Sequence, residues 1–205
     1  MGPKVQPDLL QIQLNFRLHV VVIKADIAKM YRQVEVIPEQ RKFQRILWRE
    51  NPSQAIQVYE LNTITYGTAS ASYQSTRCLK QLSIDFKESH PEASHEIANS
   101  FYVDDLASGA KDVTSAMNLS DDIVKIVTSA QMKLRKFASN SQEFLSRIPV
   151  EDCEMPDKGK CLPTLGISWY PHDDTIGYNL QPLDVKKITR RSYCLELLLS
   201  STFLD

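Results

Sequence analysis

Two adjacent carboxylates, Asp104 and Asp105, lie within the apolar stretch FYVDDLASG at residues 101–109. Ionised carboxylates repel one another and lose hydration when buried, unless a cation lies beside them. Asp-Asp also occurs at 121–122 and 173–174, where the first turns of a helix and a reverse turn are sufficient explanations. For the pair at 104–105, the competing explanation is a tight hairpin turn that uses Asp for its backbone tolerance.

A third carboxylate, Asp26, follows the apolar run LHVVVIKA and precedes Asp104 by 78 residues. If the two strands are neighbours in an antiparallel sheet, the three carboxylates converge on one edge. Such an all-oxygen pocket suits Mg²⁺, and two ions about 3.5–4 Å apart would stabilise both oxygens of a phosphoryl transfer. Without a cation, the repulsion should raise the pKa of at least one of these carboxyl groups.

The elements that must position these groups follow from hydrophobic periodicity and turn residues. We expect strands at 18–23, 42–48 and 55–61, two short strands within 99–109, and a hairpin formed by 162–170 and 175–180. We expect helices at 69–88, 112–132 and 186–204. The alternation lacks the regular spacing of βαβ units, so the sequence predicts an α+β fold with an antiparallel sheet backed by helices.

Composition sets limits on function. A chain of 205 residues with 42% hydrophobic residues can bury one sizeable core. Its 24 basic and 25 acidic residues leave only local patches for nucleic acid, which we expect around Arg41, Lys42, Arg45, Lys133, Arg135 and Lys136. Four widely spaced cysteines, with no signal-peptide or membrane-spanning run, favour the cytoplasm or nucleus. A zinc module of Cys153, Cys161 and His172 is disfavoured, because its Cys-x7-Cys spacing lacks a close pair.

Five segments, in order, resemble the successive motifs of retroelement reverse transcriptases, above all the Bel/Pao type of long-terminal-repeat retrotransposon polyprotein. They are VIKADIAKMYRQ, ITYGTASASYQ, FYVDDL, KLRKFASN and TLGISWYP, and they extend over essentially the whole chain. The resemblance implies a polymerase right-hand palm with partial fingers and a truncated thumb. Residues 1–181 would form the palm with part of the fingers, and 182–205 would begin the thumb or connection segment.

The resemblance also implies roles for individual residues. Asp26, Asp104 and Asp105 would be catalytic and would bind metal, together with the backbone carbonyl of Ile27. Lys136 would protonate the leaving pyrophosphate, although a solvated surface lysine is the alternative. Nucleotide binding is implied for Lys29, Met30, Tyr31, Tyr66 and Gly67, and primer binding for Thr164, Leu165 and Gly166. Tyr31 would exclude a ribose 2′-OH, whereas an ordinary half-buried aromatic is the alternative.

The implied activity is RNA-directed and DNA-directed DNA polymerisation, with nucleotidyl transfer from a deoxynucleoside triphosphate to a primer 3′-OH. The implied cofactors are two Mg²⁺ ions, with Mn²⁺ able to replace them. Implied partners are an RNA or DNA template with its primer, deoxynucleoside triphosphates and the remainder of a Pol polyprotein, with no membrane. The implied compartment is the cytoplasm, within a virus-like particle, or the nucleus.

The sequence departs from the family pattern at two places, where Ser72 replaces a proline and Ala130-Gln131 replaces a glycine pair. We further expect that the chain starts after the basic part of the fingers and ends within the thumb. The alternative function is therefore a catalytically inactive retroelement remnant that retains the palm fold and weak nucleic-acid binding.

Overall fold

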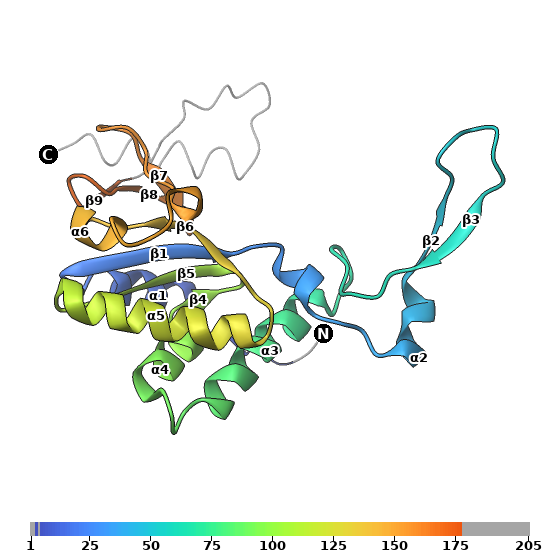
Figure 1. Ribbon diagram of the computed structural model, residues 1–205, viewed down its shortest axis with the longest axis horizontal. Helices are drawn as coiled ribbons and strands as arrows, with labels where there is room; N and C mark the ends of the chain where they lie inside the picture. Colours follow the sequence, from blue (N-terminus) through green and yellow to red (C-terminus); the bar gives the residue numbers. More distant parts are fainter. Residues whose placement is uncertain (1–2, 4, 178–205) are drawn as a thin grey trace, which may run out of the picture.

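The computed structural model describes residues 3 and 5–177, and its centre is a four-stranded antiparallel sheet in the order β4-β5-β1-β6 (Figure 1). The strands are β1 (Val21–Ile27), β4 (Phe101–Tyr102), β5 (Asp105–Ala110) and β6 (Leu134–Ala138). The α+β class and the antiparallel sheet predicted from the sequence are thus confirmed. Strand β1 has an antiparallel neighbour on each side, β5 and β6.

Strand β1 is buried on both faces, as its apolar run predicts, but it begins three residues later than predicted. Leu18 and Val20 are exposed, so the apolar character of residues 18–20 does not mark the strand. Successive side chains of a strand point to opposite faces. Val21, Ile23, Ala25 and Ile27 therefore join one apolar cluster, and Val22 joins another.

The first cluster lies between the sheet and helices α3 (Ala71–Asp85), α4 (Pro91–Asn99) and α5 (Val113–Ser129). The predicted helices 69–88 and 112–132 are confirmed as α3 and α5, with ends a few residues shorter. Helix α4 lies outside the helices that the sequence predicts, because it follows α3 closely and begins at a proline. Proline is also favoured in the first turn of a helix, and Pro91 opens α4.

The second cluster covers the opposite face of the sheet. It joins Val22 of β1 to helix α1 (Leu9–Phe16) and to a separate three-stranded sheet. That sheet consists of β7 (Leu162–Thr164), β8 (Ile167–Tyr170) and β9 (Thr175–Gly177). Asp26 and Lys24 have the same parity in β1 as Val22, and so they face this side of the sheet.

The predicted strand 162–170 is in fact two strands. Leu165 and Gly166 both have positive φ, +51° and +90°, and form the two-residue turn between β7 and β8. The hairpin around residues 171–174 is confirmed as β8–β9. Residues 178–180 of the predicted hairpin, and the predicted helix 186–204, lie outside the described residues.

A long hairpin, β2 (Arg45–Trp48) and β3 (Gln57–Glu60), projects away from the central sheet (Figure 1). It confirms the two strands predicted at 42–48 and 55–61, but both are shorter than predicted, and Lys42–Gln44 form a 3-10 helix instead. Every residue from 45 to 60 is exposed, including Leu47 and Trp48. The remaining short elements are η1 (Met30–Gln33), α2 (Pro38–Arg41), η2 (Lys42–Gln44), α6 (Gln142–Leu145) and η3 (Val150–Asp152). In the described part of the chain, no helix has the length and apolar character needed to cross a membrane.

Candidate active site

The three carboxylates singled out in the sequence lie at one end of two neighbouring strands. The β1–β5 ladder places Asp26 directly opposite Asp105. Residues opposite one another in an antiparallel pair have Cα atoms about 4.5–5.5 Å apart and side chains on the same face. Asp104 lies in the β4–β5 turn, and its carbonyl accepts a hydrogen bond of 2.9 Å from the Ile27 N–H. Asp26 and the Asp104-Asp105 pair therefore lie at the same end of the two paired strands, as expected.

The β4–β5 turn does not need aspartate for its backbone. The ladder pairs Tyr102 with Asp105, so Val103 and Asp104 form the turn. The left-handed residue is Val103, with a φ of +58°, which is an uncommon conformation for a β-branched side chain. Asp104 does not have a positive φ. A left-handed backbone conformation therefore does not explain why position 104 is an aspartate.

The electrostatic environment disfavours the charged form of both turn carboxylates. Partial burial raises the pKa of Asp104, and the nearby Asp26 raises it further. Partial burial also raises the pKa of Asp105, with further contributions from Asp104 and then Asp26. The sequence predicted a raised pKa here, and the structure adds that loss of solvent is a larger cause than repulsion. Such groups favour a neighbouring cation.

Asp26 already has cationic partners within the protein. Its Oδ1 lies 3.2 Å from Arg135 Nε, and its Oδ2 lies 3.1 Å from Lys136 Nζ. The hydrogen bond to Asp26 is the first cause of a raised pKa at Lys136. Among the described residues, no three His, Cys, Asp or Glu side chains are arranged to hold a metal ion. The described geometry is thus a carboxylate cluster neutralised partly by Arg135 and Lys136.

Two cations of this site were not assigned a role from the sequence. Lys24 is buried on the same face of β1 as Asp26, and its Nζ lies 3.6 Å from Glu154 Oε2. A lysine inside an otherwise apolar strand was the available signal for it. Arg135 is 109 residues from Asp26 in the chain, so only the β1–β6 ladder brings the two together. Arg135 was predicted only as part of a basic patch.

A cavity of about 300 Å³ adjoins the carboxylate turn. It is lined by Met30, Tyr31, Tyr66, Val103 and Asp104. The rings of Tyr31 and Tyr66 meet edge to face, with centroids 4.7 Å apart and planes at 65°. Three of the residues predicted to bind nucleotide thus share one cavity with a predicted metal ligand.

Two other predicted nucleotide-binding residues do not line this cavity. Lys29 is exposed and adopts a left-handed conformation with a φ of +49°. Gly67 has a φ of +83°, and a Cβ built there would have no atom within 4 Å. The left-handed backbone, rather than crowding by other protein atoms, explains why this residue is glycine.

The residues predicted to contact a primer belong to the three-stranded sheet. Thr164 ends β7 with a buried side chain, while Leu165 and Gly166 form the following turn. Residues 164–166 thus lie at the turn of the β7–β8 hairpin. Residues 164–166 do not line the cavity beside Asp104.

Ser72 and Ala130-Gln131, where the sequence departs from the pattern that it resembles, both fit the observed helices. Ser72 lies in the first turn of α3, where proline is also tolerated, and its carbonyl accepts bonds from the Ser75 and Thr76 hydroxyls. Ala130 is the C-cap residue of α5, and Gln131 follows with a φ of +60°. Glycine is the common residue at that left-handed position. The substitutions therefore preserve both helices.

Comparison of the sequence with models of protein families gives no match, and a search among curated proteins finds no relative. Function is therefore inferred from the geometry of the carboxylates, from the adjoining cavity and from the motifs.

Proposed function

We propose that this chain is a reverse-transcriptase domain with a polymerase right-hand palm. Its reaction would be nucleotidyl transfer from a deoxynucleoside triphosphate to a primer 3′-OH on an RNA or DNA template. The observation that carries the proposal is the pairing of Asp26 with Asp105, next to Asp104 and the cavity lined by Tyr31 and Tyr66. The left-handed residue of the β4–β5 turn is Val103, so the turn does not require an aspartate at position 104 for its backbone conformation.

In this proposal, Asp26, Asp104 and Asp105 hold the divalent cations that polymerisation needs. Carboxylate oxygens are suitable ligands for Mg²⁺, and Mn²⁺ accepts the same donors. Bound Mg²⁺ would supply charge stabilisation to the attacking and leaving oxygens. Arg135 and Lys136 lie within 3.2 Å and 3.1 Å of the Asp26 carboxylate, so Asp26 would bind metal either through its remaining lone pairs or after these two side chains move away.

Lys136 is suited to a role that depends on Asp26. The hydrogen bond and charge of Asp26 raise the pKa of Lys136, so in this arrangement its ammonium group retains its proton firmly. Release from Asp26 would remove the main cause of that shift and make Lys136 a better proton donor. One movement would thus free a carboxylate for metal and an ammonium group for the leaving pyrophosphate.

Tyr31 and Tyr66 would define the nucleotide cavity. Their edge-to-face contact orients both rings at the cavity wall. A ring held in this way could reject a ribose 2′-OH by steric exclusion, which is the role proposed for Tyr31. Met30 is buried, so its contribution to nucleotide binding would come from its backbone.

A second candidate function is favoured by one specific observation. Both oxygens of Asp26 are engaged by cations, and the described residues contain no ready group of three metal ligands. A non-catalytic retroelement remnant, which retains the palm fold and binds nucleic acid weakly, is compatible with that arrangement. The two candidates differ in whether Asp26 can be released.

Primer extension separates these functions. The purified chain is incubated with a labelled primer on RNA or DNA template, all four deoxynucleoside triphosphates and Mg²⁺ or Mn²⁺. Asp104→Asn removes a predicted ligand, and Asp173→Asn removes an exposed carboxylate from the β8–β9 turn as the matched control. We expect little extension by the wild type, the same extent of extension by Asp173→Asn, and a further loss of up to about a hundredfold in Asp104→Asn. Equal extension by all three proteins, or none by the wild type while it still binds the duplex, would favour the second candidate.

A further inference from the structure

Helix α1 contacts both turns of the three-stranded sheet through two side chains. Gln13 Nε2 donates a hydrogen bond of 2.8 Å to the carbonyl of Leu165, in the β7–β8 turn. Arg17, at the C-cap of α1, donates to Asp174 in the β8–β9 turn, with 2.6 Å to Oδ1 and 2.9 Å to the backbone carbonyl. Gln13 and Arg17 are four residues apart, and this spacing places them on the same side of the helix.

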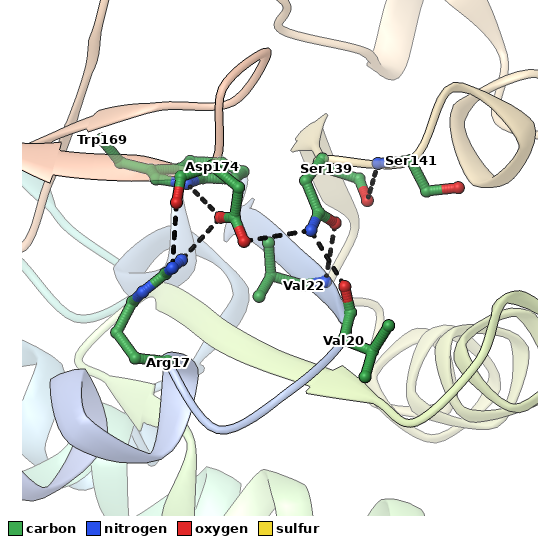
Figure 2. A network of polar contacts seen from close by, with 8 residues as sticks. Arg17, Val20, Val22, Ser139, Ser141, Trp169 and Asp174 are labelled. Carbon is green, nitrogen blue, oxygen red and sulfur yellow. Dashed lines mark hydrogen bonds and ion pairs between the residues drawn. The ribbon is translucent and has the colours of Figure 1, made fainter.

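Asp174 connects its turn to the central sheet as well (Figure 2). The indole Nε1 of Trp169 donates to Asp174 Oδ1 at 3.0 Å, and Asn140 Nδ2 donates to Oδ2 at 3.2 Å. Asn140 also donates to the Val20 carbonyl at 2.9 Å and accepts from the Val22 N–H at 3.0 Å. One carboxylate therefore joins the β8–β9 turn to α1 and to the segment after β6, and Asn140 of that segment continues the connection to β1.

These contacts determine where the small sheet sits. The described strands β7–β9 form no ladder with the four-stranded sheet, so side chains rather than backbone pairing fix their relative position. The apolar part of the attachment is an edge-to-face contact between the buried rings of Phe16 and Trp169, with centroids 5.3 Å apart. The polar contacts fasten the two turns, whose residues Leu165 and Asp174 have φ values of +51° and +48°.

We infer that α1 is the positioning element for the predicted primer contact, with Gln13, Arg17 and Asp174 as positioning residues. The inference rests on the proposed function, because it assigns the Leu165-Gly166 turn to a primer strand. A turn that is already held in its bound position has less conformational freedom to lose on binding, so a turn that shifts weakens primer binding. Gln13 acts directly on this turn, while Arg17 and Asp174 hold the far end of the same sheet.

The structural part is tested by hydrogen exchange. Gln13→Met removes the donor while it keeps a long side chain with good helix propensity. Gln11→Met, on an exposed position of the same helix, is the matched control. Loss of one hydrogen bond should speed exchange of the β7 and β8 amides about fivefold, with β1 and β5 unchanged. Asparagine tolerates the left-handed backbone at position 174. Asp174→Asn should therefore speed exchange of the β8 and β9 amides about fivefold. Unchanged exchange in both variants would overturn the inference.

The functional part is tested with a primer–template duplex, by fluorescence anisotropy and by steady-state extension. We expect Gln13→Met and Arg17→Lys to raise the dissociation constant and KM for the duplex about fivefold. The KM for nucleotide and kcat should remain within about twofold, since neither residue lines the nucleotide cavity. A general loss of folding would instead lower the active fraction, and with it kcat.

The outcomes distinguish this inference from the proposed function. Faster exchange with unchanged duplex affinity and KM would show that α1 positions the sheet but that the sheet does not hold a primer. A wild type that neither binds the duplex nor extends it would refute the proposed function and the primer assignment together. In that case, the exchange experiment still decides whether α1 positions the sheet.

Discussion

The arrangement of Asp26 opposite Asp105 lowers stability rather than raising it. Like charges that face each other across an antiparallel pair are destabilising, and partial loss of solvent adds to the effect. Arg135 and Lys136 offset this by pairing with Asp26, whereas Asp104 and Asp105 keep raised pKa values. Strain at Val103 adds a further cost in the same turn. Unfavourable features gathered at one place are typical of functional sites.

Asp105→Asn should therefore stabilise the protein at pH 7 in the absence of divalent cations. Burial is the first cause of the raised Asp105 pKa, and Asn removes the charge that burial disfavours. Because the carboxyl group is only partly buried, the gain should not exceed about 1 kcal/mol. Urea unfolding followed by circular dichroism measures it. Asp173→Asn, at an exposed turn, should leave the free energy of unfolding unchanged.

The same gain should depend on pH in a defined direction. A carboxyl group with a raised pKa binds a proton more readily in the folded than in the unfolded chain, so its contribution to stability falls as pH rises from 3.8 through the raised value. Asn does not titrate. The stability difference between Asp105→Asn and wild type should be greatest above the raised pKa and should diminish as pH falls toward 3.8. A difference that grows on acidification would contradict the assigned shift.

Individual elements show which features a sequence reveals. The apolar runs of β1 and α5 are local signals, and both elements were predicted. Strand β6 was not, because LRKFA places two charged residues in the middle of a five-residue strand. One of those residues, Arg135, is there to meet Asp26, and this partner is too distant in the chain to be visible locally. Local rules thus fail where the site requires a charge.

The end of α5 offers a test of backbone strain. The Met132 N–H bonds to the Val127 carbonyl at 3.0 Å, and the Gln131 N–H bonds to the Thr128 carbonyl at 2.8 Å, which defines a Schellman motif. Gln131 occupies its left-handed position with a φ of +60°. Gln131→Gly should therefore raise the free energy of unfolding by about 0.5–1 kcal/mol in chemical denaturation. Gln131→Ala keeps the Cβ and should give no such gain, so equal effects of the two changes would argue against strain.

Gly109 of β5 tests the close approach of β5 to the chain that enters β1. A Cβ added at Gly109 would lie 2.4 Å from the Val21 carbonyl oxygen and 2.7 Å from the Cβ of His19. Because a backbone atom is involved, the strand itself must move. We expect Gly109→Ala to lower the free energy of unfolding by about 1–3 kcal/mol. Thermal unfolding followed by circular dichroism measures this change. At Gly177 of β9 the nearest atom would be 3.7 Å away, so Gly177→Ala should be nearly neutral in the same experiment.

At the scale of the whole molecule, the sequence predicted the class of fold but not how its layers attach. Periodicity and turn residues were sufficient for the antiparallel hairpins and for the two longer helices. The attachment of the three-stranded sheet depends on contacts such as that of Gln13 with Leu165, which are 152 residues apart. Hydrophobic patterns report how much of an element is buried, but they do not identify the surface that covers it. The layers therefore had to come from the structure.

The projecting hairpin makes the distribution of stability testable across the molecule. All residues from 45 to 60 are exposed, and the Leu61 N–H bonds to the Gln44 carbonyl at 3.2 Å, so the two ends of the segment are close together. Replacement of residues 45–60 by Gly-Gly should leave the thermal midpoint within about 2 °C, because the segment buries little apolar surface against the core.

The same deletion should improve solubility, since Phe43 remains but the larger exposed group that includes Leu47, Trp48 and Val58 is removed. The slope of the free energy of unfolding against urea concentration should change little in this variant, because that slope follows the surface exposed on unfolding. A matched control replaces residues 105–110 of β5, whose removal should abolish cooperative unfolding. A fall of more than about 5 °C on loss of the hairpin would mean that residues 45–60 stabilise the fold through contacts beyond their own ladder. The hairpin would then be an integral part of the core, contrary to its exposure.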